Sequence, residues 1–264
     1  MIRFVVARVS SSLLCGNWLA LVGVLLLGVP GMAAAEGGKP GAAPAWSFSG
    51  PLGHFDLASV QRGYAVYASV CSACHGMEQV HFSDLAGIGL KAEDIQALAA
   101  TRQIADGLDA QGRVQRRPAR ADDRILSPYV SPAAARAAHG GVVPPDLSRI
   151  VMVRPGGASR IYGLLTGYAP DAQWQEGKGF RNPYGIANFT AMPPPLHEGA
   201  VQYADGTPAT VAQQARDVTT FLAWVSAPHQ DERRRLGVGA GLYLCFLAAL
   251  FMILTWRIWS HVRK

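Results

Sequence analysis

The sequence contains few cysteines, and their positions exclude a fold held together by disulfides. Its four cysteines are Cys15, Cys71, Cys74 and Cys245. Cys15 lies in an N-terminal segment that we expect to be removed, and Cys245 lies in a long apolar run, so only Cys71 and Cys74 remain in the body of the protein. Because only two residues separate them and no other cysteine is left to pair with them, something other than disulfides must stabilise this body.

The sequence also lacks an internal repeat and any convincing alternation of apolar and polar residues, so no strand is expected. Helical spacing is clearer: Val60, Tyr64, Tyr67 and Val70 recur every three or four residues, which predicts a helix over 59–73. The same reasoning predicts an all-α fold with further helices over 92–106, 132–138, 159–168 and from Thr207-Pro208 to Pro228, and loops over 109–132 and 171–206.

A basic surface for nucleic acid is missing as well, although the formal net charge is +6. Eight of the 24 basic residues lie in the first 35 residues or from residue 233 onward. The part between these ends keeps 16 basic residues against all 18 acidic ones, a net charge of −2. We therefore expect no nucleic-acid partner.

No charged residue interrupts the stretch from Leu236 to Trp256. A helix of this length rises about 30 Å, the thickness of a bilayer core, so we expect a transmembrane helix over about 236–256. Residues 233–264 then form an anchor with a short cytoplasmic tail. Basic residues flank the run on both sides, so their distribution does not set its orientation.

The N-terminus resembles a secretory signal peptide. Two arginines precede an apolar stretch over 13–29, and small residues around Ala35 suit cleavage before Glu36. An uncleaved N-terminal anchor is the alternative. Cleavage would make residues 1–35 the signal peptide and residues 36–232 an exported domain, with the later run stopping transfer across the membrane.

The stretch "VCSACHG", Val70 to Gly76, carries the chemistry. A redox dithiol needs a βαβ context that is not seen here, and a zinc site needs ligands beyond one cysteine pair, for which His54, His81 and His139 are irregularly spaced. A c-type haem accounts for every residue of the motif, with thioethers at Cys71 and Cys74 and iron ligation by His75. We therefore expect one covalently bound haem c.

The second axial ligand is expected to be a methionine, as in many c-type cytochromes. Met77 is too close to His75 to reach the opposite face of the iron, and Met152 lies in an apolar run that suggests a core position. Met192 precedes three prolines, a stiff extended segment that would hold its thioether in place. Met192 is therefore the preferred ligand, whereas water or histidine there would suit a haem enzyme such as a peroxidase.

From about Trp46 onward the chain resembles the cytochrome c1 family, the haem subunits of cytochrome bc1 complexes. The resemblance rests on the segments "QRGYAVYASVCSACHGM", "AARAAHGGVVPPDLSRI", "IYGLLTGY", "NPYGIANFTAMPPPL" and "DGTPAT", and on the arginine-flanked anchor. It implies a c-type cytochrome fold with a single C-terminal transmembrane helix, in which helices near 59–73 and 210–226 cross beside the haem.

The same resemblance implies roles for individual residues. Pro144 and Pro145 would line the haem, and Arg154 would pair with a propionate. Arg160 stands where the family usually has a tyrosine, and "NPYGIAN" replaces a longer turn before the methionine. The segment "HFSD", His81 to Asp84, also stands where many members of the family carry an arginine, and this difference and the "NPYGIAN" turn are expected to alter the haem edge and its potential.

By this resemblance, the chain is expected to be the electron-transfer subunit of a bc1 complex, not catalytic by itself. It would take electrons from the Rieske iron–sulfur protein, pass them to a cytochrome c, and assemble with cytochrome b. The expected location is the bacterial inner (cytoplasmic) membrane, single-pass, with the haem domain on the periplasmic side. The alternative is a free-standing, membrane-tethered mono-haem cytochrome c that serves an oxidase or a dehydrogenase.

Overall fold

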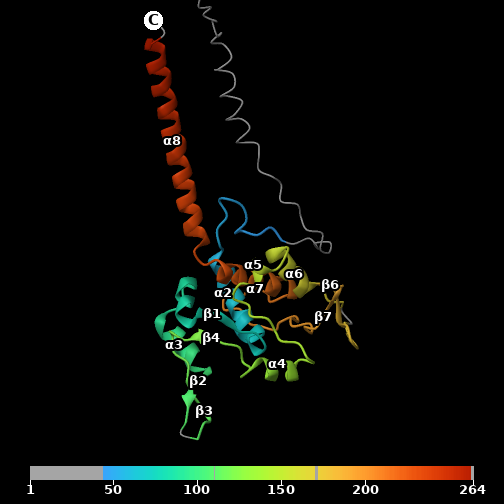
Figure 1. Cartoon of the computed structure of the whole chain (residues 1–264). Helices are drawn as coiled ribbons and strands as arrows, with labels where there is room; N and C mark the ends of the chain where they lie inside the picture. Colours follow the sequence, from blue (N-terminus) through green and yellow to red (C-terminus); the bar gives the residue numbers. More distant parts are fainter. Residues whose placement is uncertain (1–43, 110, 170–171, 263–264) are drawn as a thin grey trace, which may run out of the picture. The chain divides into compact units, whose positions relative to one another are not determined.

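A computed structural model describes residues 44–109, 111–169 and 172–262, so the expected signal peptide lies outside the described residues. Helices account for most of the regular structure in this part of the chain (Figure 1). They are α2 (Leu57–Ser69), α3 (Ala92–Ala100), α4 (Pro132–Ala138), α5 (Ile150–Val153), α6 (Gly157–Thr166), α7 (Val211–Ser226) and α8 (Gln230–Val262), with 3-10 helices at Cys71–Ala73 and Phe82–Ile88.

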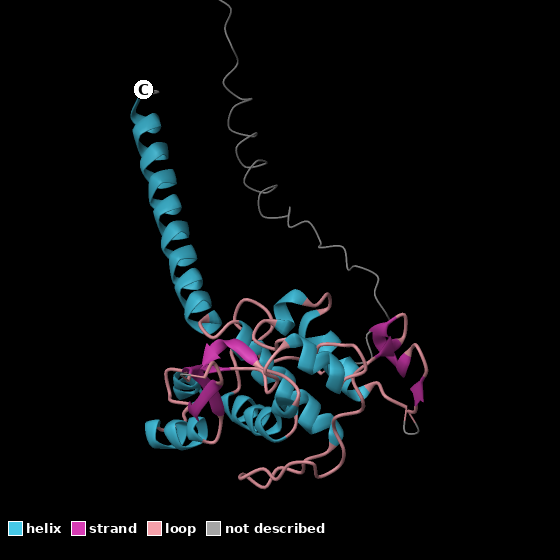
Figure 2. Cartoon of the chain, turned by 60° about the horizontal axis from the view of Figure 1, so that its bottom comes forward, coloured by secondary structure: helices cyan, strands magenta, loops and turns pink. Residues whose placement is uncertain are grey.

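The all-α expectation is wrong, because the described residues also form short antiparallel sheets (Figure 2). The strands are β1 (Met77–His81) with β4 (Arg124–Ile125), β2 (Gln103–Leu108) with β3 (Val114–Pro118), and β5 (Trp174–Gln175), β6 (Gly179–Ile186) and β7 (Phe189–Thr190). They replace parts of both expected loops, and β2 takes the end of the helix expected over 92–106. β3 is almost wholly exposed, so it has no buried face to leave an alternating pattern in the sequence.

The helix boundaries differ by a few residues from those expected. Asp56 caps α2 by accepting the N–H of Ala58 at 3.2 Å. The last helix of the body begins at Val211 rather than at Thr207-Pro208, because the Thr210 side chain accepts the N–H of Gln213 and caps it there.

The core is built around the packing of α2 on α7. Val60 and Val66 of α2 are completely buried, as are Val218 and Phe221 of α7. Gly63 lies between them, and a Cβ atom placed there would lie 2.0 Å from the Asp217 carbonyl oxygen. The close approach of the two helices therefore requires glycine at this position.

We expect Gly63→Ala to lower the free energy of unfolding by about 2 kcal/mol or more, since overpacking typically costs 1–3 kcal/mol. The added methyl group meets backbone rather than a flexible side chain, so the helices must move apart. Denaturant unfolding of the full chain in detergent measures this effect. Ser69→Ala, at an exposed position of the same helix, is the control and should change little. Equal stability of the two variants would contradict the proposed close packing.

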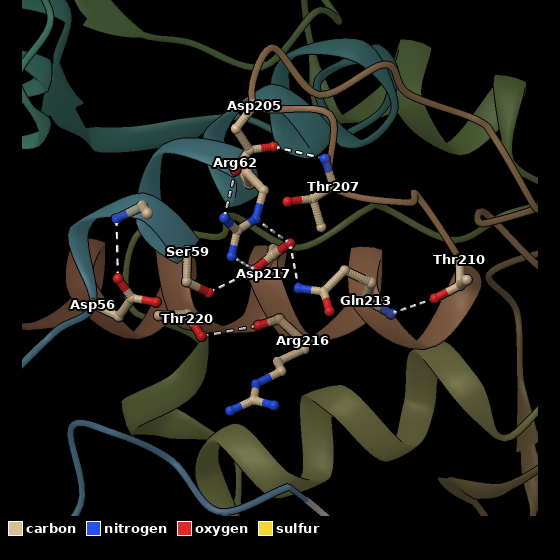
Figure 3. Close-up of polar contacts among 11 residues, drawn as sticks. Asp56, Ser59, Arg62, Asp205, Thr207, Thr210, Gln213, Arg216, Asp217 and Thr220 are labelled. Atoms are coloured by element: carbon tan, nitrogen blue, oxygen red, sulfur yellow. Dashed lines mark hydrogen bonds and ion pairs between the residues drawn. The ribbon is translucent and has the colours of Figure 1, made fainter.

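A polar cluster joins the same two helices (Figure 3). The Asp217 carboxylate is completely buried and accepts hydrogen bonds from Ser59 Oγ at 2.6 Å, Arg62 Nε at 3.0 Å and Gln213 Nε2 at 2.9 Å. Arg62 also donates to Asp205 at 2.8 Å, in the loop before α7. Both carboxylates raise the pKa of the Arg62 guanidinium, so it stays charged.

The last helix, α8, is longer than the expected span over about 236–256. It runs from Gln230 to Val262, and it is the one helix of the described chain that is long and apolar enough to cross a membrane, by length and composition. No part of its apolar segment is buried against the rest of the protein. A helix that is apolar on all sides and uncovered is suited to a lipid environment.

Candidate haem-binding site

The CxxCH motif forms a tight turn directly after α2. Residues Cys71–Ala73 are a 3-10 helix, and the Cys71 carbonyl accepts the N–H groups of Cys74 at 3.1 Å and His75 at 2.9 Å. Between the cysteines, Ser72 is buried and accepts a hydrogen bond from Arg102 Nη2 at 2.6 Å. The turn is therefore fixed from inside, while both cysteines remain unpaired thiols.

The orientation of His75 is determined by one hydrogen bond. Its Nδ1 lies 2.8 Å from the Pro145 carbonyl oxygen, which can only accept, so Nδ1 carries the proton. Burial lowers the pKa of the imidazole, although this hydrogen bond opposes that effect. A neutral imidazole protonated at Nδ1 keeps the Nε2 lone pair for a metal.

The segment after Pro145 is bonded to the residues that follow the motif. Asp146 accepts the N–H of Glu78 at 2.6 Å, and Ser148 Oγ accepts the N–H of Gln79 at 3.0 Å. Leu147 donates its N–H to the Gly76 carbonyl at 2.9 Å. The "PPDLS" segment thus lies along β1, and this pairing places the Pro145 carbonyl beside His75.

Cys71 and Cys74 differ in their surroundings. Burial raises the pKa of the Cys71 thiol to about 12, and the neighbouring Cys74 adds to the shift. Cys74 lies near Tyr129, whose own pKa is raised by burial and by a hydrogen bond with this thiol. The Tyr129 hydroxyl also lies 2.5 Å from His139 Nε2, so these two residues border the motif.

Met192, far from the motif in the sequence, is held by hydrogen bonds of its backbone. The Tyr168 hydroxyl donates to the Met192 carbonyl at 2.8 Å, and the Met192 N–H donates to Thr190 Oγ1 at 3.2 Å. The side chain is half-buried, directly after β7. These contacts position Met192 from the loop after α6 and from β7, whereas Pro145 orients His75.

The other two methionines of the body have contrasting environments. Met77 is completely buried in the core, consistent with its exclusion as a ligand. Met152 is 57% exposed, so the expectation of a core position is wrong. It lies on α5, a single turn whose Ile150 points inward while Met152 and Val153 face outward.

The residues around the motif fit a c-type haem. Two free thiols and an imidazole with a free Nε2 stand within five residues, and a thioether is available from another segment. Val142 and Val143, just before Pro144, are 45% and 37% exposed and offer apolar surface to a macrocycle. For zinc, by contrast, the described residues contain no group of three or more histidine, cysteine or acidic side chains that could hold the ion.

Comparison with known proteins identifies the family of the chain. The model of the Cytochrome C1 family matches residues 46–262. The chain belongs to the cytochrome c1 family. It is 42% identical over 229 residues to "Cytochrome c1, heme protein, mitochondrial" of Saccharomyces cerevisiae, which covers 85% of this chain and 73% of the yeast protein.

Two further relatives show how far the likeness extends. "Cytochrome c1" of Rhodospirillum rubrum is 38% identical over 258 residues, or 90% of this chain and 95% of that protein. "Cytochrome b-c1 complex catalytic subunit, mitochondrial" of Candida albicans is 39% identical over 229 residues, or 85% of this chain and 78% of that protein.

Of the three residues named from the family resemblance, Pro145 is the one with a described contact to the motif. The Pro145 carbonyl contacts His75, and Pro144 before it is half-buried. Arg154 ends α5 with an exposed side chain, and its backbone is hydrogen-bonded to Ile150 and Gly157. Arg160, the departure from the cytochrome c1 pattern, donates to the Gly185 carbonyl at 3.3 Å, near the end of β6.

Sequence reasoning missed several residues that shape this site. Tyr168 belongs to the "LLTGY" segment of the resemblance, but nothing in the sequence indicates its hydrogen bond to the Met192 carbonyl. Gly76 was also overlooked, although a Cβ there would lie 2.5 Å from the Ser127 backbone nitrogen. Both depend on contacts between segments far apart in the sequence, which spacing alone does not reveal.

Proposed function

We propose that this chain is the haem-carrying electron-transfer subunit of a cytochrome bc1 complex. It would accept electrons from the Rieske iron–sulfur protein and deliver them to a cytochrome c. The supporting observation is the hydrogen bond from His75 Nδ1 to Pro145, within a chain that matches the cytochrome c1 family over 46–262. That bond leaves the Nε2 lone pair free to bind an iron, and several relatives are named heme proteins or subunits of a b-c1 complex.

In this proposal Cys71 and Cys74 attach one haem c by thioether bonds, and His75 and Met192 are the axial ligands of its iron. The bound haem supplies a one-electron redox couple. Pro145 orients the imidazole, and Pro144 adds apolar lining. Arg154 is proposed to pair with a propionate, since its exposed guanidinium is available to an anionic group.

The protein itself makes and breaks no bonds in electron transfer, so its residues act by placement and exclusion of water. The Pro145 carbonyl keeps the imidazole neutral at Nε2, and the Tyr168 hydroxyl holds the Met192 backbone. A neutral nitrogen and a neutral thioether favour a high potential, because neither adds negative charge to oxidised iron.

We further propose that α8 anchors the chain in a bacterial inner membrane, with the haem domain on the periplasmic side and cytochrome b as a membrane partner. Residues 1–35 would be the exporting signal, and residues 36–232 the exported domain. The support is the uncovered apolar surface of α8 and the likeness to the Rhodospirillum rubrum protein.

Co-purification tests the proposed function. Gentle detergent extraction of the native membrane should yield this chain together with a b-type cytochrome and an iron–sulfur protein. Recovery of the chain as a lone haem protein would instead support a free-standing tethered cytochrome. Binding of carbon monoxide or cyanide at neutral pH would contradict a methionine-ligated iron.

The variant Tyr168→Phe should weaken the hold on Met192 while leaving the haem attached. It removes the hydrogen bond to the Met192 carbonyl, a contribution of about 1 kcal/mol. We expect the weak far-red absorption of sulfur-ligated ferric haem to disappear at a lower temperature than in the parent. Tyr162→Phe, on α6 just before Tyr168, is the matched control and should leave this transition in place. Identical transitions in all three proteins would contradict the positioning role.

The boundary of the soluble domain gives another prediction. Cutting the chain after Arg235 should yield a water-soluble domain with low-spin haem, because the apolar run begins at Leu236. Cutting after Glu232 should lower its thermal stability, since Arg234 donates to the Phe48 and Gly53 carbonyls at 2.7 Å each. Thermal unfolding followed by haem absorbance compares the two. Equal stability would show that the first turns of α8 contribute nothing to the body.

A further inference from the structure

A cavity of about 290 Å³ lies at the start of α8, where the body meets the apolar segment. Leu52 and His54 line it from the segment before α2, and Asp231, Arg234, Arg235 and Val238 line it from α8. None of these residues has a part in the haem site. The cavity therefore needs a separate explanation.

The walls of this cavity are fixed to one another. Asp231 Oδ2 accepts the N–H of Phe55 at 3.0 Å, and Gln230 Nε2 donates to the Phe48 carbonyl at 3.2 Å. Arg234 reaches the same Phe48 carbonyl and that of Gly53. These bonds hold the first two turns of α8 against residues 48–55, so the cavity is a built feature of the fold.

The cavity lies at the boundary between polar and apolar surface. Arg235 is the last charged residue before the uncharged run that begins at Leu236. Beyond it, Val238 lines the cavity and Leu242 follows on the same helix face, four residues further on, with 69% of its surface exposed. Leu52, on the opposite wall, is 79% exposed. A molecule bound here would meet charge at one end and apolar side chains at the other.

The charged groups specify the chemistry of that molecule. Arg235 offers an exposed cation suited to a phosphate. Asp231 Oδ1 is buried and has no hydrogen-bond partner among the described residues, so it requires a donor. A group that carries both a phosphate and a primary amine satisfies both residues, and acyl chains would follow Val238 and Leu242.

We propose that this cavity binds the headgroup of a membrane phospholipid of the phosphatidylethanolamine type. Its phosphate lies at Arg235, and its ammonium donates to Asp231. The inference rests on the proposal that α8 spans a membrane. An anionic headgroup such as phosphoglycerol complements Arg235 but brings no cation to the Asp231 carboxylate, so the zwitterionic lipid is preferred.

Native mass spectrometry of the full, haem-loaded chain in detergent tests this assignment. The protein is exchanged against equimolar phosphatidylethanolamine and phosphatidylglycerol with identical acyl chains. We expect one retained phosphatidylethanolamine, and about a tenfold lower occupancy in Arg235→Gln, since loss of one charge-assisted hydrogen bond corresponds to roughly that factor. Arg233→Gln is the matched control, because it removes an exposed cation two residues away that does not line the cavity.

Asp231→Asn tests the amine separately. This variant should keep phosphate binding but lose the preference for phosphatidylethanolamine over phosphatidylglycerol. Equal occupancy in Arg235→Gln and Arg233→Gln, or no preference between the lipids in the parent, would overturn the proposal. If Asp231→Asn fails to fold, the Arg235→Gln comparison still decides the assignment.

Alkaline extraction of membranes separates failure of the site from failure of the anchor. Recovery of the chain in the extract would show that α8 does not span the membrane, and both proposals would fall. Recovery in the membrane pellet together with no retained phosphatidylethanolamine would overturn the lipid site alone. The co-purification experiment on the bc1 complex is independent of both results.

Discussion

Met192→Leu should keep its covalently attached haem but lose the weak far-red absorption of sulfur-ligated ferric haem. The two cysteines are untouched, so attachment does not depend on residue 192. The missing thioether removes a soft, neutral ligand that favours reduced iron. We expect the reduction potential to fall by on the order of a hundred millivolts or more, a fraction of the roughly 0.8 V that axial ligands span in haem proteins. Electron delivery from the iron–sulfur protein would then be uphill, and turnover of the complex would fail.

Met152→Leu is the matched control for this variant. Met152 is 57% exposed on α5, so the exchange should leave the far-red band unchanged. It should change the free energy of unfolding by no more than about 0.5 kcal/mol. Redox titration and absorption spectra of the two purified proteins provide the comparison. Loss of the far-red band in Met152→Leu, with the band retained in Met192→Leu, would show that Met192 is not the iron ligand.

Helices that pack through an apolar stripe could be predicted from the sequence, whereas surface strands could not. The stripe of α7 includes Val218 and Leu222, which are buried, and its spacing predicts a helix. The β2–β3 ribbon instead depends on polar contacts such as Arg117 with Asp106 at 3.1 Å and with Asp123 at 2.6 Å. Charged residues on an exposed ribbon follow no hydrophobic period, so β3 resembled a loop and β2 the end of a helix.

The candidate site divides in a similar way. The motif at Cys71, Cys74 and His75 is local, so its spacing alone suggested the chemistry. The partner of His75 lies 70 residues away at Pro145, and that of Met192 lies 24 residues away at Tyr168. Pro145 came from a family resemblance and Tyr168 was missed, because neither contact has a local pattern. The assignment of Met152 to the core failed because α5 is a single turn, too short for an apolar run to imply burial on all sides.

Asp217→Ala should be the most destabilising single change in the polar cluster between α2 and α7. The carboxylate accepts hydrogen bonds from Ser59, Arg62 and Gln213, and its side chain is completely inaccessible to solvent. Its removal leaves the Arg62 guanidinium, only 17% exposed, without its buried counter-charge. Breaking a buried pair in this way costs about 3–5 kcal/mol, because the remaining charge stays desolvated. Denaturant unfolding of the full chain in detergent, followed by near-ultraviolet circular dichroism, measures the loss.

Asp205→Ala distinguishes the buried Arg62–Asp217 pair from the solvent-exposed Arg62–Asp205 pair. Asp205 binds the same guanidinium at 2.8 Å, but its side chain is 45% exposed, so water screens the pair. We expect a much smaller loss of stability than in Asp217→Ala. The double variant Arg62→Met/Asp217→Leu should regain most of the stability lost in Asp217→Ala, since apolar side chains of similar size leave no unpaired charge. If the double variant is no more stable than Asp217→Ala, the cost arises from the lost Ser59 and Gln213 hydrogen bonds rather than from the stranded arginine.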